Sequence, residues 1–154
     1  MTHQEISHYR QVSQKLYKTS PSSPQEIVRH LGAIQAQDYA MAKWAIGSRC
    51  DASEKVIEEA INAGTIIRTH ILRPTWHFVA AQDIYWMLDV SGPQVKRIVT
   101  SYVKKYGFDE RKLDQLNVTI ERMLAGNNHL TRDEIMQELT IKKIVSEDFL
   151  GAAI

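Results

Sequence analysis

The sequence predicts a mainly α-helical protein with one small β-hairpin, in which a winged helix, a variant of the helix-turn-helix, is followed by additional helices. Two observations predict this class. Amphipathic helical segments follow one another up to Gly64, and the apolar pattern then changes from helical to alternating spacing. Three short helices followed by a hairpin is the element order of a winged helix.

The composition is that of a folded globular protein, with 154 residues, 44% apolar and 24% charged. No apolar run reaches the roughly 18 residues of a membrane helix, and the amino end shows no secretory signal. We therefore expect a cytoplasmic protein, associated with the nucleoid if it is bacterial, and the single Cys50 fits a reducing compartment. The formal net charge of +1 gives weak support for nucleic-acid binding, so a DNA-binding role depends on where the charges lie.

Start and stop signals divide the first 64 residues into four helices. The clearest start is an N-cap hydroxyl at Ser23, a proline at the first helical position and a capping-box carboxylate at Glu26. Asp51 and Glu54 open the last of the four, and Gly64 ends it. We expect helices over residues 4–18, from 23 to about 32, around 41–46 and over 51–64.

Residues 65–79 are predicted to form the hairpin. Residues 66–72 alternate between two faces, a second β-rich run covers 75–79, and Arg73 and Pro74 form the turn. Further helices are expected near residues 83–89, 93–105 and 111–125, and a second capping box opens another at Thr131. These elements suggest a winged-helix-like unit over 1–90, a helical extension over 91–126, and the start of a second, truncated winged-helix unit over 127–154.

Two segments of the sequence resemble a known family. Residues 31–38 read LGAIQAQD, and residues 68–79 read RTHILRPTWHFV. Together they resemble the winged-helix DNA glycosylases of the AlkZ and YcaQ type, over roughly residues 23–139. A Gln-x-Gln at a helix exit with this hairpin behind it is more specific than a Gln-x-Gln alone. The resemblance implies hydrolysis of the N-glycosidic bond of alkylated or crosslinked purines in damaged double-stranded DNA, with Gln35 and Gln37 as the catalytic residues.

Glutamine chemistry fits this reaction, although glutamine has no useful pKa and is no general acid or base. A purine alkylated at N7 or N3 already carries a positive charge, so it departs as a neutral base without being protonated. Two amides then act by positioning a water against the sugar carbon and by placing partial negative charge near the developing oxocarbenium ion. Asp38 would add a full charge, but we interpret it as the N-cap of a helix beginning at Tyr39. Without the resemblance, both glutamines are simply solvated residues leaving a helix.

The candidate DNA contacts are cationic or N–H-bearing side chains near the hairpin and in the acid-free stretch 91–107. The alternative is that one or both histidines are satisfied within the hairpin and that the stretch is a solvated helix face. We expect Val95, Ile98, Val99 and Tyr102 to bury the other side of this helix. The candidates are Arg68, His70, Arg73, His77, Lys96, Arg97, Lys104 and Lys105.

No metal and no cofactor are expected, because two histidines without a cysteine or a nearby acidic residue fall short of a usual ligand set. Three carboxylates in residues 54–59, in the helix before the wing, argue against readout of the DNA major groove.

Two alternatives stay open: a DNA-binding or regulatory module without catalysis, and an inactive fragment, since full-length relatives are more than twice as long. The expected sign of a fragment is exposed apolar surface around Ile135, Leu139, Ile144 and Phe149. Lesion preference and oligomeric state stay open.

Overall fold

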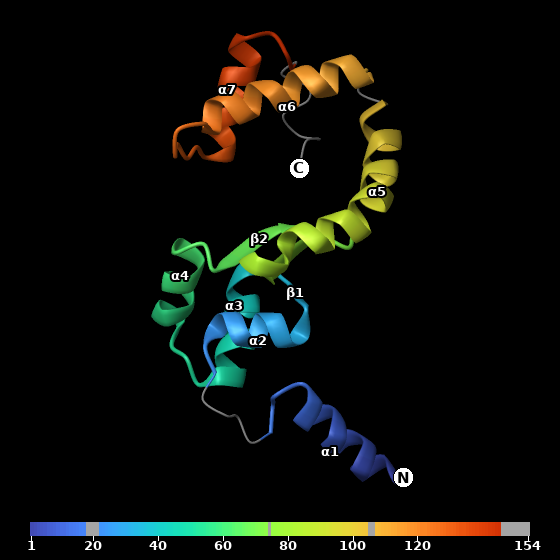
Figure 1. Cartoon of the computed structure of the whole chain (residues 1–154), viewed down its shortest axis with the longest axis vertical. Helices are drawn as coiled ribbons and strands as arrows, with labels where there is room; N and C mark the ends of the chain where they lie inside the picture. Colours follow the sequence, from blue (N-terminus) through green and yellow to red (C-terminus); the bar gives the residue numbers. More distant parts are fainter. Residues whose placement is uncertain (18–21, 74, 105–106, 146–154) are drawn as a thin grey trace. The chain divides into compact units, whose positions relative to one another are not determined.

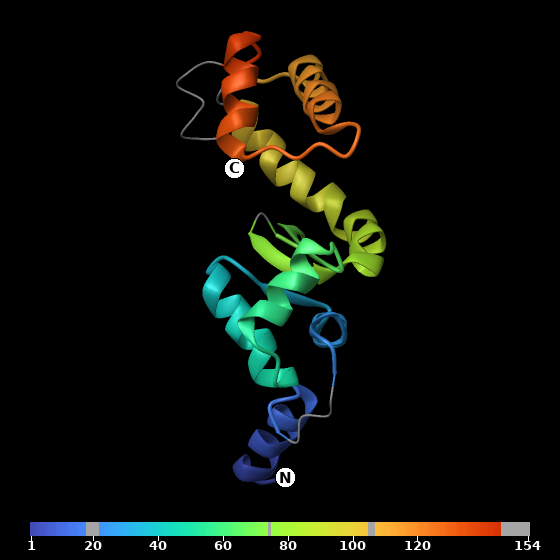
Figure 2. The same cartoon turned by 90° about the vertical axis from the view of Figure 1, so that its left-hand side faces the viewer.

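The computed structural model describes residues 1–17, 22–73, 75–104 and 107–145. It consists of helices with one small antiparallel sheet, which confirms the predicted fold class (Figures 1 and 2). The chain divides into two compact units, Met1–Arg97 and Ile98–Ile154. The elements in order are α1 (His3–Ser13), α2 (Pro24–Leu31), β1 (Ala33–Gln35), α3 (Tyr39–Cys50), α4 (Glu54–Asn62), β2 (Ile66–His70), β3 (Trp76–Ala80), η1 (Ala81–Asp83), α5 (Ile84–Val103), α6 (Glu110–Leu124) and α7 (Arg132–Ile141).

The sheet has three antiparallel strands in the order β1-β3-β2. The predicted hairpin is confirmed, with His70 of β2 opposite Trp76 of β3. The sequence reading of residues 31–38 as a helix exit misses the third strand, β1, in which Ile34 pairs with Phe78. Gly32, with φ of +76°, ends α2 and turns the chain into this strand. A strand of three residues is too short to show alternation in the sequence.

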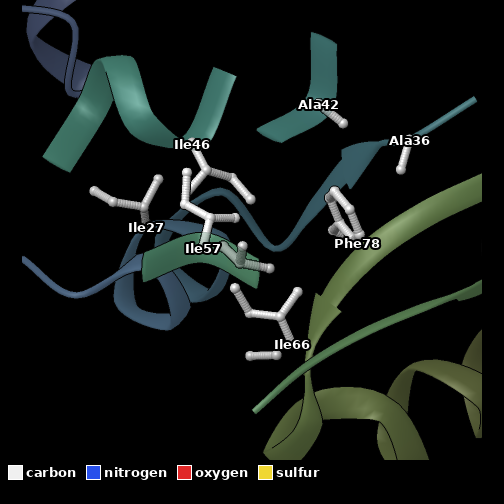
Figure 3. Packing of buried hydrophobic residues seen from close by; sticks show 9 residues of the cluster. Ile27, Ala36, Ala42, Ile46, Ile57, Ile66 and Phe78 are labelled. Carbon is white, nitrogen blue, oxygen red and sulfur yellow. The ribbon is translucent and has the colours of Figure 1, made fainter. Parts of the chain in front are cut away.

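The main core of the first unit lies between α2, α3, α4 and one face of the sheet (Figure 3). Ile27 comes from α2, Ile46 from α3 and Ile57 from α4, and all three are fully buried beside Phe78 of the central strand. These four side chains fix the helices against the sheet, since burying an aliphatic or aromatic side chain contributes about 1.5–3 kcal/mol.

The opposite face of the sheet is covered by the first turns of α5. Val79 follows Phe78 in β3 and therefore points to the other face, where it packs with Ile71 and Met87. Both faces of β3 are thus buried, and the strand forms the centre of the first unit.

Capping interactions begin helices where the sequence predicts them. The Glu26 carboxylate accepts hydrogen bonds from the backbone N–H of Ser23 at 2.7 Å and from its hydroxyl at 2.9 Å, and these bonds lower the pKa of Glu26. Glu134 accepts from the backbone N–H of Thr131 at 2.7 Å at the start of α7. The first helix is shorter than predicted, because α1 ends at Ser13.

The prediction of two helices over 83–105 is wrong, because α5 runs without interruption from Ile84 to Val103. Pro93 lies inside it and removes one backbone hydrogen bond, which the remaining turns tolerate. Ser91 ties this region to the hairpin: its hydroxyl donates to the Met87 carbonyl at 2.7 Å and accepts the Leu72 N–H at 3.3 Å. The expected burial of the apolar side of this helix is also wrong at Ile98 and Val99, which are 45% and 39% exposed.

The second unit has a small core of its own. Phe108, Met136, Leu139 and Val145 are buried together, with Ile135 and Ile144 packed against them. The exposed apolar surface expected of a fragment is therefore not found at Ile135, Leu139 or Ile144, and Phe149 lies outside the described residues. Within the described residues, no helix is long and apolar enough to cross a membrane.

Candidate functional site

The Gln35-Ala36-Gln37 segment lies at the end of β1, on an edge of the sheet. Ala36 is fully buried in the main core, whereas Gln35 and Gln37 are both exposed. Extended backbone sends alternate side chains to opposite sides, so burial of Ala36 directs both glutamines away from the core. The segment therefore presents two uncharged amide side chains to solvent.

Backbone hydrogen bonds attach this segment to the start of β3. The Ala36 N–H donates to the Trp76 carbonyl at 2.8 Å, and the Trp76 N–H donates to Oε1 of Gln37 at 3.2 Å. Gln35 is paired with His77 in the sheet register. The Gln37 amide is thus held through its oxygen, which keeps a second lone pair and leaves its NH₂ group as a donor.

Arg68 holds the same segment from β2. Its guanidinium donates two hydrogen bonds to the Ala36 carbonyl, from Nε at 3.1 Å and from Nη2 at 3.0 Å. Its Cζ also lies 4.5 Å from the ring centroid of Trp76 and 5.5 Å from that of Tyr39. These cation–π contacts add to hydrogen bonds that are themselves stronger because the donor is charged. The sequence reading of Arg68 as a phosphate contact does not anticipate this internal role.

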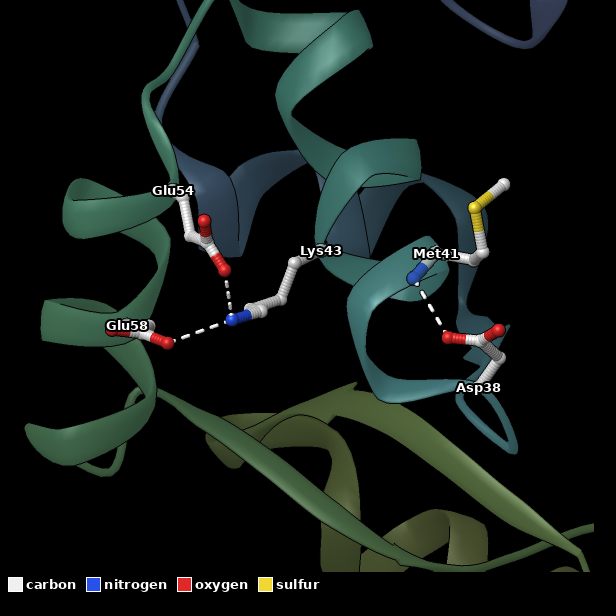
Figure 4. A network of polar contacts seen from close by, with 5 residues as sticks. All are labelled: Asp38, Met41, Lys43, Glu54 and Glu58. Carbon is white, nitrogen blue, oxygen red and sulfur yellow. Dashed lines mark hydrogen bonds and ion pairs between the residues drawn. The ribbon is translucent and has the colours of Figure 1, made fainter.

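Asp38 and Tyr39 connect the glutamines to α3. Oδ1 of Asp38 accepts from the Met41 N–H at 3.0 Å, so Asp38 is the predicted N-cap (Figure 4). The Tyr39 ring packs edge-on against Phe78, with 5.7 Å between ring centroids. The end of the Gln-x-Gln segment is thereby fixed to the core and to a helix start.

The two histidines of the hairpin do not share a face with each other. His70 lies on the same face as Arg68 and its ring contacts that of Trp76, with 4.1 Å between ring centroids and the planes tilted by 44°. Burial lowers the pKa of His70, and the charges of Arg68 and His77 lower it further. His77 is only 4% exposed, and its Nδ1 lies 2.8 Å from the Thr75 carbonyl. Because the ring is buried and its Nδ1 lies against the Thr75 carbonyl, His77 is poorly placed for the phosphate contact that the sequence suggests.

The other predicted DNA contacts are exposed where they are described. Arg73 lies in the turn of the hairpin, and its neighbour Pro74 lies outside the described residues. Lys96 and Arg97 are exposed on α5, where Nη2 of Arg97 donates to Gln94 Oε1 at 2.6 Å. Lys104 is exposed in the second unit, and Lys105 lies outside the described residues. The structure thus leaves Arg73, Lys96, Arg97 and Lys104 as exposed cations.

A buried lysine links α3 to α4 close to this site. The Lys43 side chain is 7% exposed, and its ammonium contacts the carboxylates of Glu54 and Glu58, the second at 2.7 Å (Figure 4). These hydrogen bonds raise the pKa of Lys43. Two of the three carboxylates noted in residues 54–59 are thereby engaged within the fold. Nothing in the sequence pattern singled out Lys43, because its partners lie 11 and 15 residues away.

The described residues contain no cluster of three or more His, Cys, Asp or Glu side chains able to hold a metal ion. The polar groups of the sheet edge are instead amides, a guanidinium and backbone peptides.

The order helix, strand, two helices and hairpin, with a three-stranded sheet, defines a winged-helix unit, and an exposed pair of glutamines marks its sheet edge. Residues 28–150 match the family described as DNA glycosylase AlkZ-like. This chain therefore belongs to the AlkZ-like DNA glycosylase family.

A solved structure, that of the Streptomyces sahachiroi DNA glycosylase AlkZ, has a similar fold, with a TM-score of 0.76 at 20% sequence identity. The similarity covers 99% of this chain and 40% of the length of that protein. No curated protein sequence matches this chain.

Proposed function

We propose that this chain carries the catalytic edge of a DNA repair glycosylase that hydrolyses the N-glycosidic bond of alkylated purines in duplex DNA. One observation carries the proposal: Gln35 and Gln37 are exposed together at the sheet edge, while Ala36 between them is buried and anchored. Family membership supports the proposal. The chain spans 40% of the length of the protein in the similar structure. Glycosylase activity is therefore proposed for this chain and does not follow from the similarity alone.

The proposed reaction needs no proton donor for the leaving group. Water attacks the sugar carbon, the bond from that carbon to the purine nitrogen breaks, and its electron pair neutralises the positive charge of the alkylated base. The water loses a proton to solvent. Gln35 and Gln37 orient the water and place amide oxygens beside the oxocarbenium ion, an electrostatic and positional form of catalysis.

The proposed DNA contacts are the exposed cations of the first unit, Arg73, Lys96 and Arg97, together with Lys104 of the second. Each neutralises phosphate charge without reading sequence, which suits an enzyme that recognises a lesion in any context. His70 remains on the wing but is not counted as a cation, because its lowered pKa keeps it neutral near neutral pH.

A binding module without catalysis is the second candidate. The exposed cations Arg73, Lys96 and Arg97 fit this candidate as well, because phosphate contacts need no catalytic group. Sequence readout of the major groove is disfavoured, because Glu54 and Glu58 lie on α4, the helix that precedes the wing. Both carboxylates bind Lys43, so this lysine is not free to contact DNA.

The test is release of free base from a duplex that contains N7-methylguanine. We expect release by the wild-type chain and a loss of roughly 10²-fold or more when Gln35→Ala is combined with Gln37→Ala, because each amide stabilises the transition state. Gln115→Ala with Gln137→Ala is the matched control, since both glutamines are exposed in the second unit. Unchanged release by the Gln35 and Gln37 variant would refute the catalytic assignment, and binding without release would favour the module.

A further inference from the structure

We propose that Arg68 is a positioning residue for the Gln35-Ala36-Gln37 segment and not a contact for DNA phosphate. The effect of Arg68 on catalysis rests on the proposed function, in which Gln35 and Gln37 are the catalytic residues. The structural part of the proposal, the anchoring by Arg68 of the peptide that joins Ala36 to Gln37, stands on contacts within the first unit alone.

The two peptide groups that flank Ala36 are held by different partners. The peptide between Gln35 and Ala36 is held by its N–H, which donates to the Trp76 carbonyl at 2.8 Å. The peptide between Ala36 and Gln37 is held by its carbonyl, which accepts both hydrogen bonds from Arg68. Rotation of either peptide would turn the adjoining glutamine, so both glutamines depend on these contacts for their orientation.

Arg68 anchors the second peptide where the sheet no longer does. Strand β1 ends at Gln35, so the Ala36 carbonyl lies past the last strand pair of this edge. The guanidinium supplies the missing donors. The same guanidinium lies over the Trp76 ring, and the Trp76 N–H donates to the Gln37 side chain. Arg68, Ala36, Trp76 and Gln37 therefore form a closed set of contacts.

The chemistry of this position requires arginine rather than any cation. Nε and Nη2 lie side by side on a planar group, so both can donate to one oxygen while the flat face rests on a ring. A lysine ammonium is a point charge with no such plane. Two donors are committed to Ala36 and the side chain is only partly exposed, which leaves Arg68 poorly placed to neutralise phosphate.

The test compares Arg68→Lys with Arg73→Ala in the full chain. The first readout is the set of ¹⁵N-labelled side-chain amide signals of Gln35 and Gln37 with the backbone amide of Trp76. We expect Arg68→Lys to shift these signals and Arg73→Ala to leave them in place. The second readout is the salt dependence of binding to undamaged duplex, which we expect Arg73→Ala to reduce by about one in slope and Arg68→Lys to leave unchanged.

The third readout is the single-turnover rate of N7-methylguanine release. We expect Arg68→Lys to lower the rate by roughly 10²-fold at saturating DNA without weakening binding, because misplaced groups lose rate rather than affinity. Unmoved glutamine signals together with a lower salt slope would overturn the inference. If the wild-type chain releases no base, the proposed function fails, but the amide signals still decide whether Arg68 positions the segment.

Should Arg68→Lys fail to fold, the wild-type chain offers an independent measurement. The Nε–H of Arg68 donates to a carbonyl, so we expect it to exchange with solvent at least about tenfold more slowly than that of exposed Arg73. Equal exchange at the two positions would contradict the proposal.

Discussion

Two cations of the first unit lie near the ring of Tyr39. Lys43 reaches it from α3, with Nζ 4.7 Å from the ring centroid, and Arg68 reaches it from β2, with Cζ at 5.5 Å. Lys43 binds the carboxylates of Glu54 and Glu58, whereas Arg68 binds a neutral backbone carbonyl. The two side chains share a ring but differ in the kind of partner they hold.

This difference in partners predicts that Lys43 contributes to the stability of the fold and that Arg68 positions the glutamine segment. The partners of Lys43 are side chains of a neighbouring helix, so its contacts hold α3 and α4 together. The partner of Arg68 is the Ala36 carbonyl, in the peptide that joins Ala36 to the exposed Gln37, so its contacts bear on the direction of that side chain. Changes on the Lys43 side should therefore alter the free energy of unfolding, and changes on the Arg68 side should alter the site.

The largest effect is expected at Phe78, which packs against the Tyr39 ring. Phe78 is fully buried in the central strand and packs against Tyr39, so Phe78→Ala leaves a cavity and should lower the free energy of unfolding by about 3–5 kcal/mol. Urea denaturation measures this. The matched control is Val118→Ala, an exposed site in the second unit, which should change it by under about 0.5 kcal/mol. If Phe78→Ala lowers the free energy of unfolding as little as Val118→Ala does, Phe78 is not a central residue of the core.

The next effect is expected when the carboxylates around Lys43 are neutralised. Glu54→Gln with Glu58→Gln leaves a buried ammonium without an anionic partner, whereas Lys43→Met removes the charge and keeps an apolar stem. We expect the double glutamine variant to be the less stable of the two by thermal unfolding. Its loss should exceed that from Glu59→Gln, which breaks an exposed pair with Lys55, since such pairs contribute about 0.3–0.5 kcal/mol. If the double glutamine variant and Glu59→Gln lose equal stability, Lys43 does not form a buried link between α3 and α4.

Alkaline pH sharpens the same comparison. Because the fold raises the pKa of Lys43, the stability from this contact is fully present below the unfolded lysine value of about 10.4 and is lost as pH rises through the folded value. The wild-type chain should therefore lose more stability above about pH 10.4 than Lys43→Met does. Parallel pH profiles of the two proteins would contradict the assignment.

The smallest effect is expected at His70, on the Arg68 side. The fold lowers the pKa of His70, so the unfolded chain binds its proton first and stability falls as pH drops below the unfolded value of about 6.5. We expect His70→Gln to reduce this fall between pH 7.5 and 5.5 by under about 1 kcal/mol. Unfolding free energies at the two pH values measure it, and an unchanged slope would show that His70 is solvated.

Much of the fold could be predicted from local signals. Ser23 and Glu26 begin α2 as expected, and the alternating pattern after Gly64 gives the hairpin. The third strand was missed because β1 is too short to show a pattern. The expected break near Pro93 was wrong because packing against the hairpin, seen in the buried Ser91 hydroxyl, outweighs one missing hydrogen bond.

The candidate site was predictable in part. The motif identified the Gln-x-Gln segment, and the exposure of Gln35 and Gln37 agrees with a surface role, but what holds the segment could not be read from sequence. Arg68 is 32 residues from Ala36, and Gln37 is 39 from Trp76. Such contacts depend on strand register, which assigns Arg68 and His77 to opposite faces although both are polar residues of one hairpin.

The central claim is that Arg68 and β3 immobilise the peptide groups between the two glutamines. Hydrogen exchange of the Ala36 backbone amide in the full chain tests it most directly. The Ala36 amide donates to the Trp76 carbonyl, whereas the Ala36 carbonyl accepts from Arg68. We predict that this amide exchanges at least about 10²-fold more slowly than the exposed turn amide of Gly126, and that Arg68→Ala, which frees the Ala36 carbonyl, lowers this protection without abolishing it. Exchange of Ala36 as fast as Gly126 in the wild-type chain would contradict the account.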